Sequence, residues 1–233
     1  MNIPRKVTNL ISFFLDNLLP PIIRDSKLFM TFPMKILYGQ DFKTFMEFKN
    51  NFPKYSDKDV QKIYAVSDHG KITRETDLNT GCINFILNNL VGDSVLDIGC
   101  GTGFLCNLIE SKGKLVTGAD FVIGSAKEKY PNINFVETGI EKTVFTDNQF
   151  DTVISAHTIE HIKNPQNAIN ELRRICSRQL IVILPCQRPY RYTFDLHVNF
   201  FPYEYDVLRA LDPPSGNYSI QKIQGDWVYH EKL

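Results

Sequence analysis

From about residue 77 onward, short apolar runs alternate with segments whose apolar residues recur at helical spacing. Runs such as SVLDI at 94–98 are short and rich in branched side chains, which is typical of buried strands. Strands that alternate with helices indicate a parallel sheet covered on both faces. We therefore predict a doubly wound α/β fold with strands at 94–98, 115–119, 133–137, 150–156, 178–184, 218–223 and 227–229, and helices at 78–90, 104–111, 125–130, 165–176 and 202–211.

The N-terminal part of the chain has a different pattern. Residues 7–19 (VTNLISFFLDNLL) have helical spacing, include Asp16, and are fewer than the roughly 20 apolar residues that a membrane span needs, so we predict no transmembrane segment. Arg5 and Lys6 leave a membrane-surface helix open, but packing on the main domain or on a second copy is favoured. With a further helix at 42–52, we predict a helical extension over 1–76 and a main domain over 77–233.

Composition narrows the class of protein. The 233 residues contain 26 Lys and Arg against 26 Asp and Glu, a balance that makes a nucleic-acid partner unfavourable because such proteins need a basic surplus. Five cysteines without a CxxC pair or a preceding secretory leader favour free thiols in a reducing compartment. We therefore expect a cytoplasmic protein, either a monomer or a homodimer.

The most informative residues are VLDIGCGTG at 95–103, where a predicted strand runs into Gly99, Gly101 and Gly103. Glycine accepts positive φ angles and lets a ligand approach the backbone closely. The turn then opens a helix at Phe104, whose N-terminal amides suit an anionic group. The pattern therefore predicts a ligand-binding loop.

Two acids extend this prediction. Asp97 lies at the end of the first strand, and Asp120 lies at the end of the next, 21 residues after Gly99. An acid in the second position can accept both hydroxyls of a ribose. Gly103 comes one residue too early for the dinucleotide motif GxGxxG. The spacing therefore favours a nucleoside without a pyrophosphate over a dinucleotide.

These motifs resemble those of the class I S-adenosylmethionine-dependent methyltransferases. VLDIGCGTG is similar to the first motif of that family, and TGADF contains the matching ribose-binding acid, Asp120. Residues 144–165 (VFTDNQFDTVISAHTIEHIKNP) and the stretch RRICSRQLIVILP are similar to the segments around the fourth and fifth strands. The resemblance covers about residues 75–211 and implies a seven-stranded sheet that binds the cofactor, S-adenosylmethionine, at the carboxyl ends of its strands.

The resemblance also implies roles for individual residues around the cofactor. The loop would line the methionine end, Asp120 would hold the ribose, and Phe121 would lie beside the adenine. Backbone groups of 139–141 would cap the adenine, although the family usually has Asp or Asn about where Gly139 stands. The complete set of implied cofactor-binding residues is Arg74, Asp97, Gly99, Cys100, Gly101, Asp120, Phe121, Gly139, Ile140, Glu141 and Ser155.

The acceptor side contains His157, Glu160 and His161, which share one face if the segment forms a helical turn. With His197 they are a plausible site for Mn²⁺, Fe²⁺ or Zn²⁺. The arrangement is similar to the ExxEH segments of small-RNA 2′-O-methyltransferases and quinone O-methyltransferases, with His157 replacing the first Glu. Three interpretations stay open here: a divalent metal site, a metal-free catalytic group in which one histidine is a base, and a structural cluster.

A further stretch follows the fifth predicted strand. Arg188, Arg191 and Tyr192 are candidates to bind an anionic group of the substrate, although arginines on a loop are also commonly just solvated. The N-terminal helices look similar to extensions on methyltransferases of bacterial surface-polysaccharide pathways.

We therefore predict O-methylation of a small anionic or sugar-linked substrate, which includes phosphorylated or nucleotide-linked molecules, in capsule or surface polysaccharide biosynthesis. One alternative is a metal-dependent RNA 2′-O-methyltransferase, which the balanced charge disfavours. The other is a non-catalytic cofactor-binding partner subunit.

Overall fold

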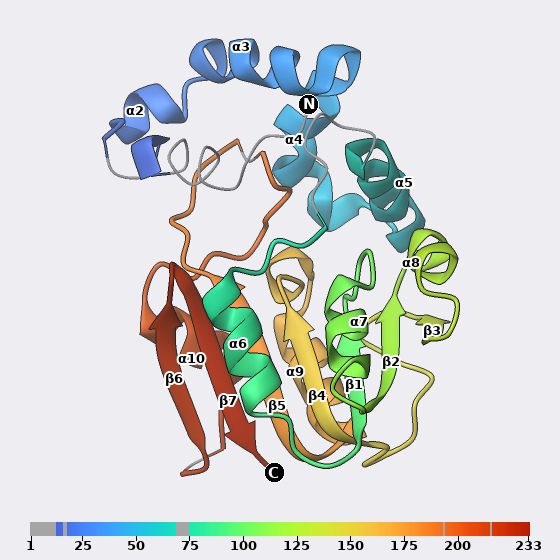
Figure 1. The fold of residues 1–233 in the computed structure, drawn as a ribbon. Coiled ribbons are helices and arrows are strands. Elements are labelled where there is room, and N and C mark those ends of the chain that lie inside the picture. The colour runs from blue at the N-terminus through green and yellow to red at the C-terminus, as the bar shows by residue number, and fades with distance from the viewer. Residues whose placement is uncertain (1–12, 16–17, 69–74, 193, 215) are drawn as a thin grey trace. The chain divides into compact units, whose positions relative to one another are not determined.

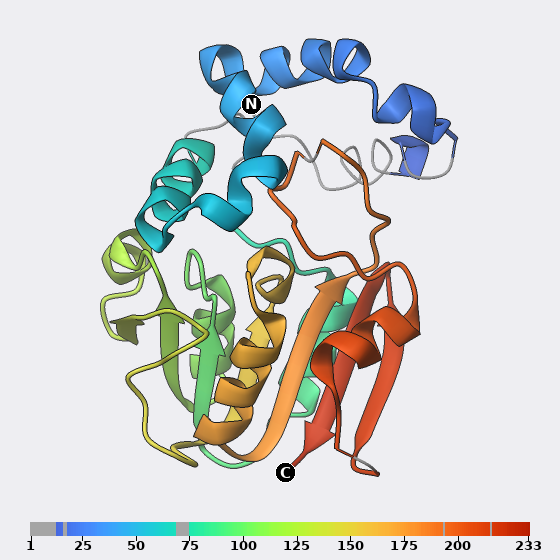
Figure 2. The ribbon, with the colours of Figure 1, turned by 180° about the vertical axis from the view of Figure 1, so that it is seen from behind.

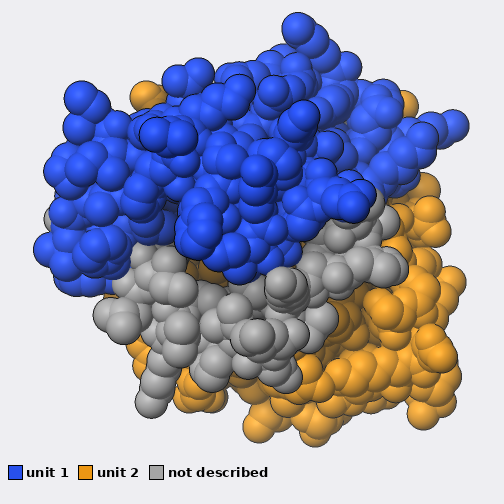
Figure 3. Space-filling model, turned by 90° about the horizontal axis from the view of Figure 1, so that it is seen from above, with its two compact units in different colours: residues 1–74, 187–198 blue, residues 75–186, 199–233 orange. Residues whose placement is uncertain are grey.

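The computed structural model describes residues 13–15, 18–68, 75–192, 194–214 and 216–233. The chain divides into two compact units, coloured separately in Figure 3. Unit 1 contains residues 1–74 and 187–198, and unit 2 contains residues 75–186 and 199–233. The sequence predicts a boundary after residue 76, whereas in the structure the loop 187–198 also belongs to the N-terminal unit. No local sequence pattern predicts that assignment.

Unit 2 is built around a seven-stranded sheet with the order β3-β2-β1-β4-β5-β7-β6 (Figure 1). The strands β1 to β5 are parallel to one another, and β7 is antiparallel to both β5 and β6. The strands are β1 (Ser94–Ile98), β2 (Leu115–Asp120), β3 (Asn134–Glu137), β4 (Phe150–Ala156), β5 (Cys176–Pro185), β6 (Tyr218–Ile223) and β7 (Asp226–Lys232).

Helices cover both faces of this sheet, as Figures 1 and 2 show from opposite sides. Successive residues of a strand face opposite sides, so Val95 packs into the core beneath α6 and α7, and Leu96 packs into the core beneath α9 and α10. The helices are α6 (Thr80–Asn88), α7 (Phe104–Glu110), α8 (Gly124–Lys129), α9 (Pro165–Ile175) and α10 (Glu204–Leu211), with a single turn η3 (Ile159–His161) after β4. The predicted doubly wound fold is confirmed.

A buried ion pair fixes the antiparallel strand β7 to helix α9. The guanidinium of Arg173 donates to both carboxylate oxygens of Glu231 at 2.9–3.1 Å, and the Tyr229 hydroxyl donates to the same carboxylate at 2.6 Å. Glu231 is fully buried. A buried carboxylate needs such partners because it has lost its hydration. The pair therefore helps to set the position of β7 in the sheet.

One edge of the sheet collects the ends of the strands that carry the predicted motifs. We call it the carboxyl edge: β1, β2, β4 and β5 end there at Ile98, Asp120, Ala156 and Pro185. The register pairs Ile98 with Ser155, and Pro185 with Asp226. Because β7 is antiparallel, its first residue rather than its last lies at this edge.

Unit 1 is helical. Its core contains Met30 and Met34 from α3, aromatic residues from α4, and Tyr192 from the loop 187–198. Its elements are α2 (Pro21–Arg24), α3 (Lys27–Tyr38), η1 (Gly39–Asp41), α4 (Phe42–Asn51), η2 (Phe52–Lys54) and α5 (Asp57–Asp68). Helix α4 confirms the helix predicted at 42–52. The helix predicted at 7–19 lies mostly outside the described residues, and α3 and α5 were not predicted.

Helix–loop hydrogen bonds hold the loop 187–198 within unit 1. Arg24 donates to the carbonyl oxygen of Pro189 at 3.1 Å, Lys49 donates to that of Tyr190, and the hydroxyl of Tyr38 donates to that of Phe194. Burial lowers the pKa of Lys49 to about 8, against the opposing effect of nearby carboxylates. Long side chains thus satisfy the loop's backbone carbonyls, which explains its assignment to this unit. None of the helices in the described part of the chain has the length and apolar composition that a bilayer span requires.

Candidate functional site

The glycine loop between β1 and α7 bends through left-handed conformations. Gly99 has φ 79° and Gly101 has φ 50°, angles that side-chain-bearing residues rarely adopt. A Cβ at Gly99 would come within 2.0 Å of the Thr158 hydroxyl oxygen, whereas a Cβ at Gly101 would meet nothing within 4 Å. Gly99 therefore permits close packing inside the protein, and Gly101 leaves open space beside the backbone.

Asp120, the last residue of β2, is bound to the loop. One carboxylate oxygen accepts a hydrogen bond from the Gly101 amide at 2.9 Å, and the other accepts from the Val122 amide at 3.4 Å. A carboxylate offers about four acceptor positions, so Asp120 can accept further donors. The structure thus brings the predicted loop and the predicted acid together.

Asp97 is buried within β1 at the same edge. Its carboxylate accepts a bond from the Cys106 thiol at 3.3 Å. Burial raises the pKa of Asp97 to about 7; the Cys106 contact opposes this shift, and the Asp120 carboxylate adds to it. A carboxyl with a raised pKa beside a ligand loop is a feature of functional sites, since structural carboxyls are more often paired with cations. Asp97 is therefore suited to a cationic ligand group.

The predicted adenine-binding segment 139–141 is packed and hydrogen-bonded within unit 2. A Cβ at Gly139 would come within 2.9 Å of the Phe121 ring, so this ring packs directly against the Gly139 backbone. The side chain of Ile140 is buried in the core, and the Glu141 carboxylate accepts a bond from the Asn164 amide at 3.1 Å. Ile140 and Glu141 therefore offer a ligand mainly their backbone groups. Their role toward adenine stays a prediction.

Three further residues, Cys100, Ser155 and Arg74, are predicted to bind the cofactor. The Cys100 side chain is buried in the core under α6 and α7, which leaves its backbone for a ligand. The hydroxyl of Ser155 is buried and has no hydrogen-bond partner among the described residues. Arg74 lies outside the described residues. The assignment of all three stays a prediction.

His157, the first residue after β4, lies between two carboxylates. Its Nδ1 atom is 3.4 Å from the Glu160 carboxylate and its Nε2 atom is 3.3 Å from that of Asp226. Burial alone would lower the pKa of His157, but bonds to Asp226 and Glu160 outweigh it and raise the pKa to about 10. Both ring nitrogens thus face acceptors. This geometry favours an imidazolium over either a base or a metal ligand.

Asp226 is the site residue that the sequence analysis missed. Besides His157, it contacts Asn79, whose side-chain amide donates to the same carboxylate oxygen at 2.7 Å. Asn79 also caps α6 by accepting a bond from the Cys82 amide at 2.8 Å. The sequence shows only that Asp226 is an acid at the start of the last strand. Asp226 lies at the carboxyl edge because that strand is antiparallel.

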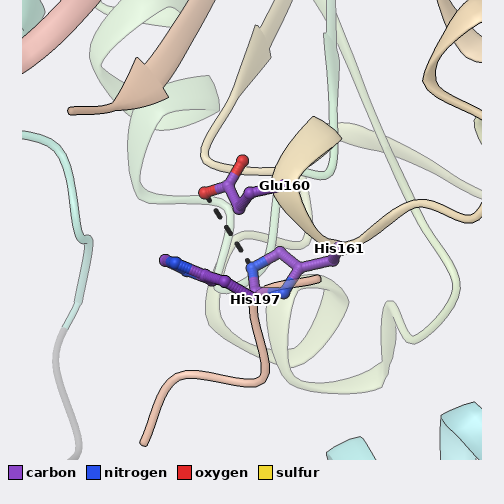
Figure 4. A group of neighbouring side chains, drawn as sticks. All are labelled: Glu160, His161 and His197. Atoms are coloured by element: carbon purple, nitrogen blue, oxygen red, sulfur yellow. Dashed lines mark ion pairs between the residues drawn. The ribbon is translucent and has the colours of Figure 1, made fainter. Parts of the chain in front are cut away.

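Glu160 and His161 are neighbours in the turn η3, where Figure 4 shows their side chains converging. The His161 Nε2 atom lies 3.9 Å from the Glu160 carboxylate, which is fully buried. The backbone carbonyl oxygen of Glu160 accepts a bond from the Asn199 amide at 2.9 Å, which anchors the turn. At 3.9 Å the two side chains are within ion-pair distance but beyond hydrogen-bond distance, so Glu160 can act on His161 through its charge.

His197 belongs to unit 1. There its Nδ1 atom lies 2.5 Å from the Gln187 side-chain oxygen and 3.3 Å from the Asp195 carboxylate. The predicted metal site would combine this residue with three residues of unit 2. The four-residue metal site therefore stays a prediction.

The predicted substrate-binding residues lie on the loop of unit 1. Arg188 and Arg191 are exposed and Tyr192 is buried, with the Arg191 guanidinium 5.4 Å from the centre of the Tyr192 ring. A cleft within unit 1 is lined by Lys27, Met46, Glu47, Asn50, Asn51, Arg191 and Tyr192. Two cations and two amides against one carboxylate suit an anionic group, but no ligand assignment follows from the lining alone.

The sequence of the sheet region matches a known family. A family described as a methyltransferase domain matches residues 96–184, which run from β1 to β5. The chain is 31% identical over 110 residues to a ubiquinone biosynthesis O-methyltransferase of Glaesserella parasuis, covering 42% of this chain and 47% of that protein. A protein of the same description from Pectobacterium carotovorum is 24% identical over 148 residues, covering 56% and 61%. The chain thus spans about half the length of the curated relatives it matches.

Solved structures share the fold. A SAM-dependent methyltransferase from Aquifex aeolicus has a TM-score of 0.52 at 18% identity, covering 64% of this chain and 88% of that one. A protein of Pyrococcus horikoshii has a TM-score of 0.55 at 20% identity, covering 80% and 98%. At these identities the likeness extends to the fold, in agreement with the seven-stranded sheet.

Proposed function

We propose that this chain, which contains a class I S-adenosylmethionine-dependent methyltransferase domain, transfers the methyl group of S-adenosylmethionine to an oxygen atom of a small molecule. One observation carries the proposal: the Asp120 carboxylate lies 2.9 Å from the Gly101 amide, beside space that a side chain at residue 101 would enter. The O-methyltransferase names of the matched relatives support the choice of oxygen.

The residues at this edge fit the cofactor's chemical groups. Asp120 would accept the ribose hydroxyls, as acids at the end of a second strand do in related nucleotide folds. The buried Asp97 would face the ammonium group of the methionine part, where a cation offsets the cost of an ionised buried carboxyl. Phe121, packed on Gly139, would offer an apolar surface to the adenine. The cytoplasm stays the predicted location.

The bound cofactor supplies a methyl group on a positively charged sulfur, so the electrophile needs no further activation. In the transfer, a bond forms between the acceptor oxygen and the methyl carbon, the sulfur–carbon bond breaks, and the acceptor hydroxyl loses its proton. The protein must therefore align the acceptor and remove a proton. We assign proton removal to the His161 imidazole, with the charge of Glu160 stabilising the cation that forms.

His157 takes a different part in this proposal. Because Glu160 and Asp226 flank its ring nitrogens, it is held as a cation beside the proposed base. A fixed positive charge there compensates the two buried carboxylates.

The proposal extends to the chemical class of the methyl acceptor. The cleft with Lys27 and Arg191 in unit 1 supports an acceptor that carries a phosphate or carboxylate, such as a sugar-linked phosphate. If so, Arg191→Ala raises the KM for a phosphorylated acceptor while leaving the Kd of S-adenosylmethionine unchanged. Arg178→Ala, at an exposed arginine of unit 2, is the matched control. A KM that stays the same in Arg191→Ala removes this acceptor class. The surface-polysaccharide setting stays a prediction.

A divalent metal is the alternative to proton removal by His161, because an imidazole that binds a metal cannot also be the base. Glu160 and His161 supply carboxylate and imidazole donors of the kind that Mn²⁺, Fe²⁺ and Zn²⁺ bind, and His197 would add another imidazole. Elemental analysis of protein purified without a histidine tag tests this proposal directly. Stoichiometric metal that is lost in His197→Ala supports it, and metal-free protein with full activity in chelator contradicts it.

The function is tested by following the release of S-adenosylhomocysteine in the presence of hydroxyl-bearing acceptors, including catechols, sugar phosphates and nucleotide-linked sugars. We expect turnover with at least one class, and a fall in kcat of about 100-fold or more in His161→Ala. His230→Ala is the matched control, because that histidine bonds Gln179, which pairs with the last residue of β7, away from the carboxyl edge. Turnover that is equal in both variants contradicts the role of His161, and absence of cofactor binding contradicts the function itself.

A further inference from the structure

Helix α3 of unit 1 is apolar on both sides. Its inner side carries Met30 and Met34, which are completely buried against α4. Its outer side carries Leu28, Phe32 and Ile36 at intervals of four residues, with 87%, 72% and 51% of their surface exposed. An ordinary surface helix has a polar outer face, and a helix that is apolar all round is normally covered. The outer side of α3 therefore has the composition of a covered surface.

The exposed surface extends onto the preceding helix. In α2, Ile22 is 84% exposed and Ile23 is also exposed. We call the combined surface the α2–α3 face; it consists of Ile22, Ile23, Leu28, Phe29, Phe32 and Ile36. Single exposed apolar residues are normal in proteins, but a run of six large ones within 15 residues marks an interaction surface.

The charges of helix α3 itself are all positive, and the acid Asp25 precedes the helix. Lys27 and Lys35 are the only charged residues of α3, and no Asp or Glu occurs between Ser26 and Gln40. Both lysines are exposed, and the Lys35 ammonium lies 5.1 Å from the centre of the Phe42 ring at the side of the apolar surface. Long lysine side chains of this kind reach from an apolar surface toward water or lipid headgroups.

The residue types of the α2–α3 face help to distinguish a protein partner from a lipid surface. Interfaces between proteins are enriched in aromatic residues, methionine and arginine and are depleted of lysine, so the two lysines are the distinguishing feature here. Helices that lie in a membrane interface combine Phe, Leu and Ile on one face with flanking lysines, because lipid headgroups are anionic and acyl chains are apolar. The α2–α3 face has the second composition. Its twelve-residue helix α3 is about 18 Å long, which suits a helix that lies along the surface.

We propose that the α2–α3 face binds the surface of an anionic lipid bilayer, with Leu28, Phe32 and Ile36 entering the acyl region and Lys27 and Lys35 contacting headgroups. This proposal does not depend on the methyl-transfer function. It concerns only unit 1, and it predicts that the protein partitions onto vesicles whether or not cofactor is bound.

The test is co-sedimentation of the full chain with vesicles of phosphatidylcholine alone or with 30% phosphatidylglycerol. We expect binding to the anionic vesicles, a loss of at least tenfold in Leu28→Glu/Phe32→Glu, and a loss of roughly fivefold for each lysine changed to Gln. Leu115→Glu is the matched control: Leu115 is a leucine of unit 2 that is 75% exposed and outside the α2–α3 face. It should bind like the unaltered chain.

Other outcomes overturn the proposal. The first is an unaltered chain that stays in the supernatant with all vesicles. The second is equal vesicle binding by the unaltered chain and by the double variant. The third is a concentration-dependent dimer in analytical ultracentrifugation that the double variant abolishes, without vesicle binding, which would assign the face to a second copy. Because both altered residues are exposed, thermal unfolding should be nearly unchanged, and this measurement confirms that each variant is folded.

Discussion

The two halves of the carboxyl edge hold their functional groups in different ways. At β1 and β2, backbone shape dominates: Gly99 and Gly101 turn in left-handed conformations, and Asp120 binds the amide of Gly101. Beyond β4, side-chain charge dominates, since His157 lies between the carboxylates of Glu160 and Asp226. In the first arrangement Asp120 bonds a residue 19 positions away, whereas the second also joins His157 and Asp226, which are 69 positions apart. The first half and the His157–His161 segment therefore leave motifs in the sequence, and the contact of His157 with Asp226 does not.

The largest effect is expected for Asp120→Ala, which should weaken cofactor binding without altering the residues of the acceptor side. Asp120→Ala removes the acceptor that we assign to the ribose hydroxyls, so affinity for S-adenosylmethionine should fall by about 100-fold or more. Isothermal titration calorimetry measures it. Asp206→Ala is the control, because Asp206 is a buried carboxyl that caps α10. An affinity that stays the same in Asp120→Ala removes the ribose assignment.

Gly99 lies against Thr158 of the second half of the carboxyl edge, whereas a Cβ at Gly101 would meet no atom within 4 Å. Gly99→Ala drives a methyl group against Thr158, the neighbour of His157, in addition to the strain of a positive φ. We expect it to destabilise the protein by about 2–4 kcal/mol and to impair both cofactor binding and turnover. Gly101→Ala should cost only about 1–2 kcal/mol of stability, because its space is open.

Cofactor affinity distinguishes these two variants further. The methyl group of Gly101→Ala enters the space that we assign to the ligand, so this variant should lose affinity although it remains well folded. Chemical denaturation and calorimetry on both variants test the comparison. Equal losses of stability would show that Gly99 makes no special contact, and unchanged affinity in Gly101→Ala would place the ligand elsewhere.

The acceptor half is tested through Asp226. Asp226→Asn keeps the size of the side chain but weakens the bond that holds His157, so we expect kcat to fall by about 10- to 30-fold. The Kd of S-adenosylmethionine should change less than twofold, since Asp226 is assigned to the other half of the edge. Asp206→Asn again provides the control. A parallel loss of cofactor affinity would contradict the division of the edge into two halves.

A smaller effect concerns the pH dependence of cofactor binding. Burial raises the pKa of Asp97 to about 7, while Cys106 opposes the shift and Asp120 adds to it. A ligand ammonium prefers the ionised carboxyl, which predominates only above that pKa. Affinity for S-adenosylhomocysteine should therefore rise about tenfold from pH 6 to pH 8 and then level off. Asp97→Asn should remove this rise, and an unaltered chain with constant affinity would contradict the role of Asp97.

Local patterns predicted much of unit 2 because its strands are continuous apolar runs. The bounds of β1 and β4 agree with the predicted ranges, as do those of β6. Helix α3 was not predicted for two reasons. Pro33 lies inside it, and its apolar residues occupy both sides, so they do not form the single stripe that indicates a surface helix. The contact of His157 with Asp226 depends on the antiparallel direction of β7, which is a tertiary property that no window of residues contains.

The most direct test is a crystal structure of the full chain with S-adenosylhomocysteine. The account predicts that the ribose hydroxyls lie within hydrogen-bond distance of the Asp120 carboxylate, with the ammonium group near Asp97 and the sulfur directed toward His157 and His161. A ligand bound at another place on the chain, or with Asp120 bonded only to the backbone of the loop, would contradict it.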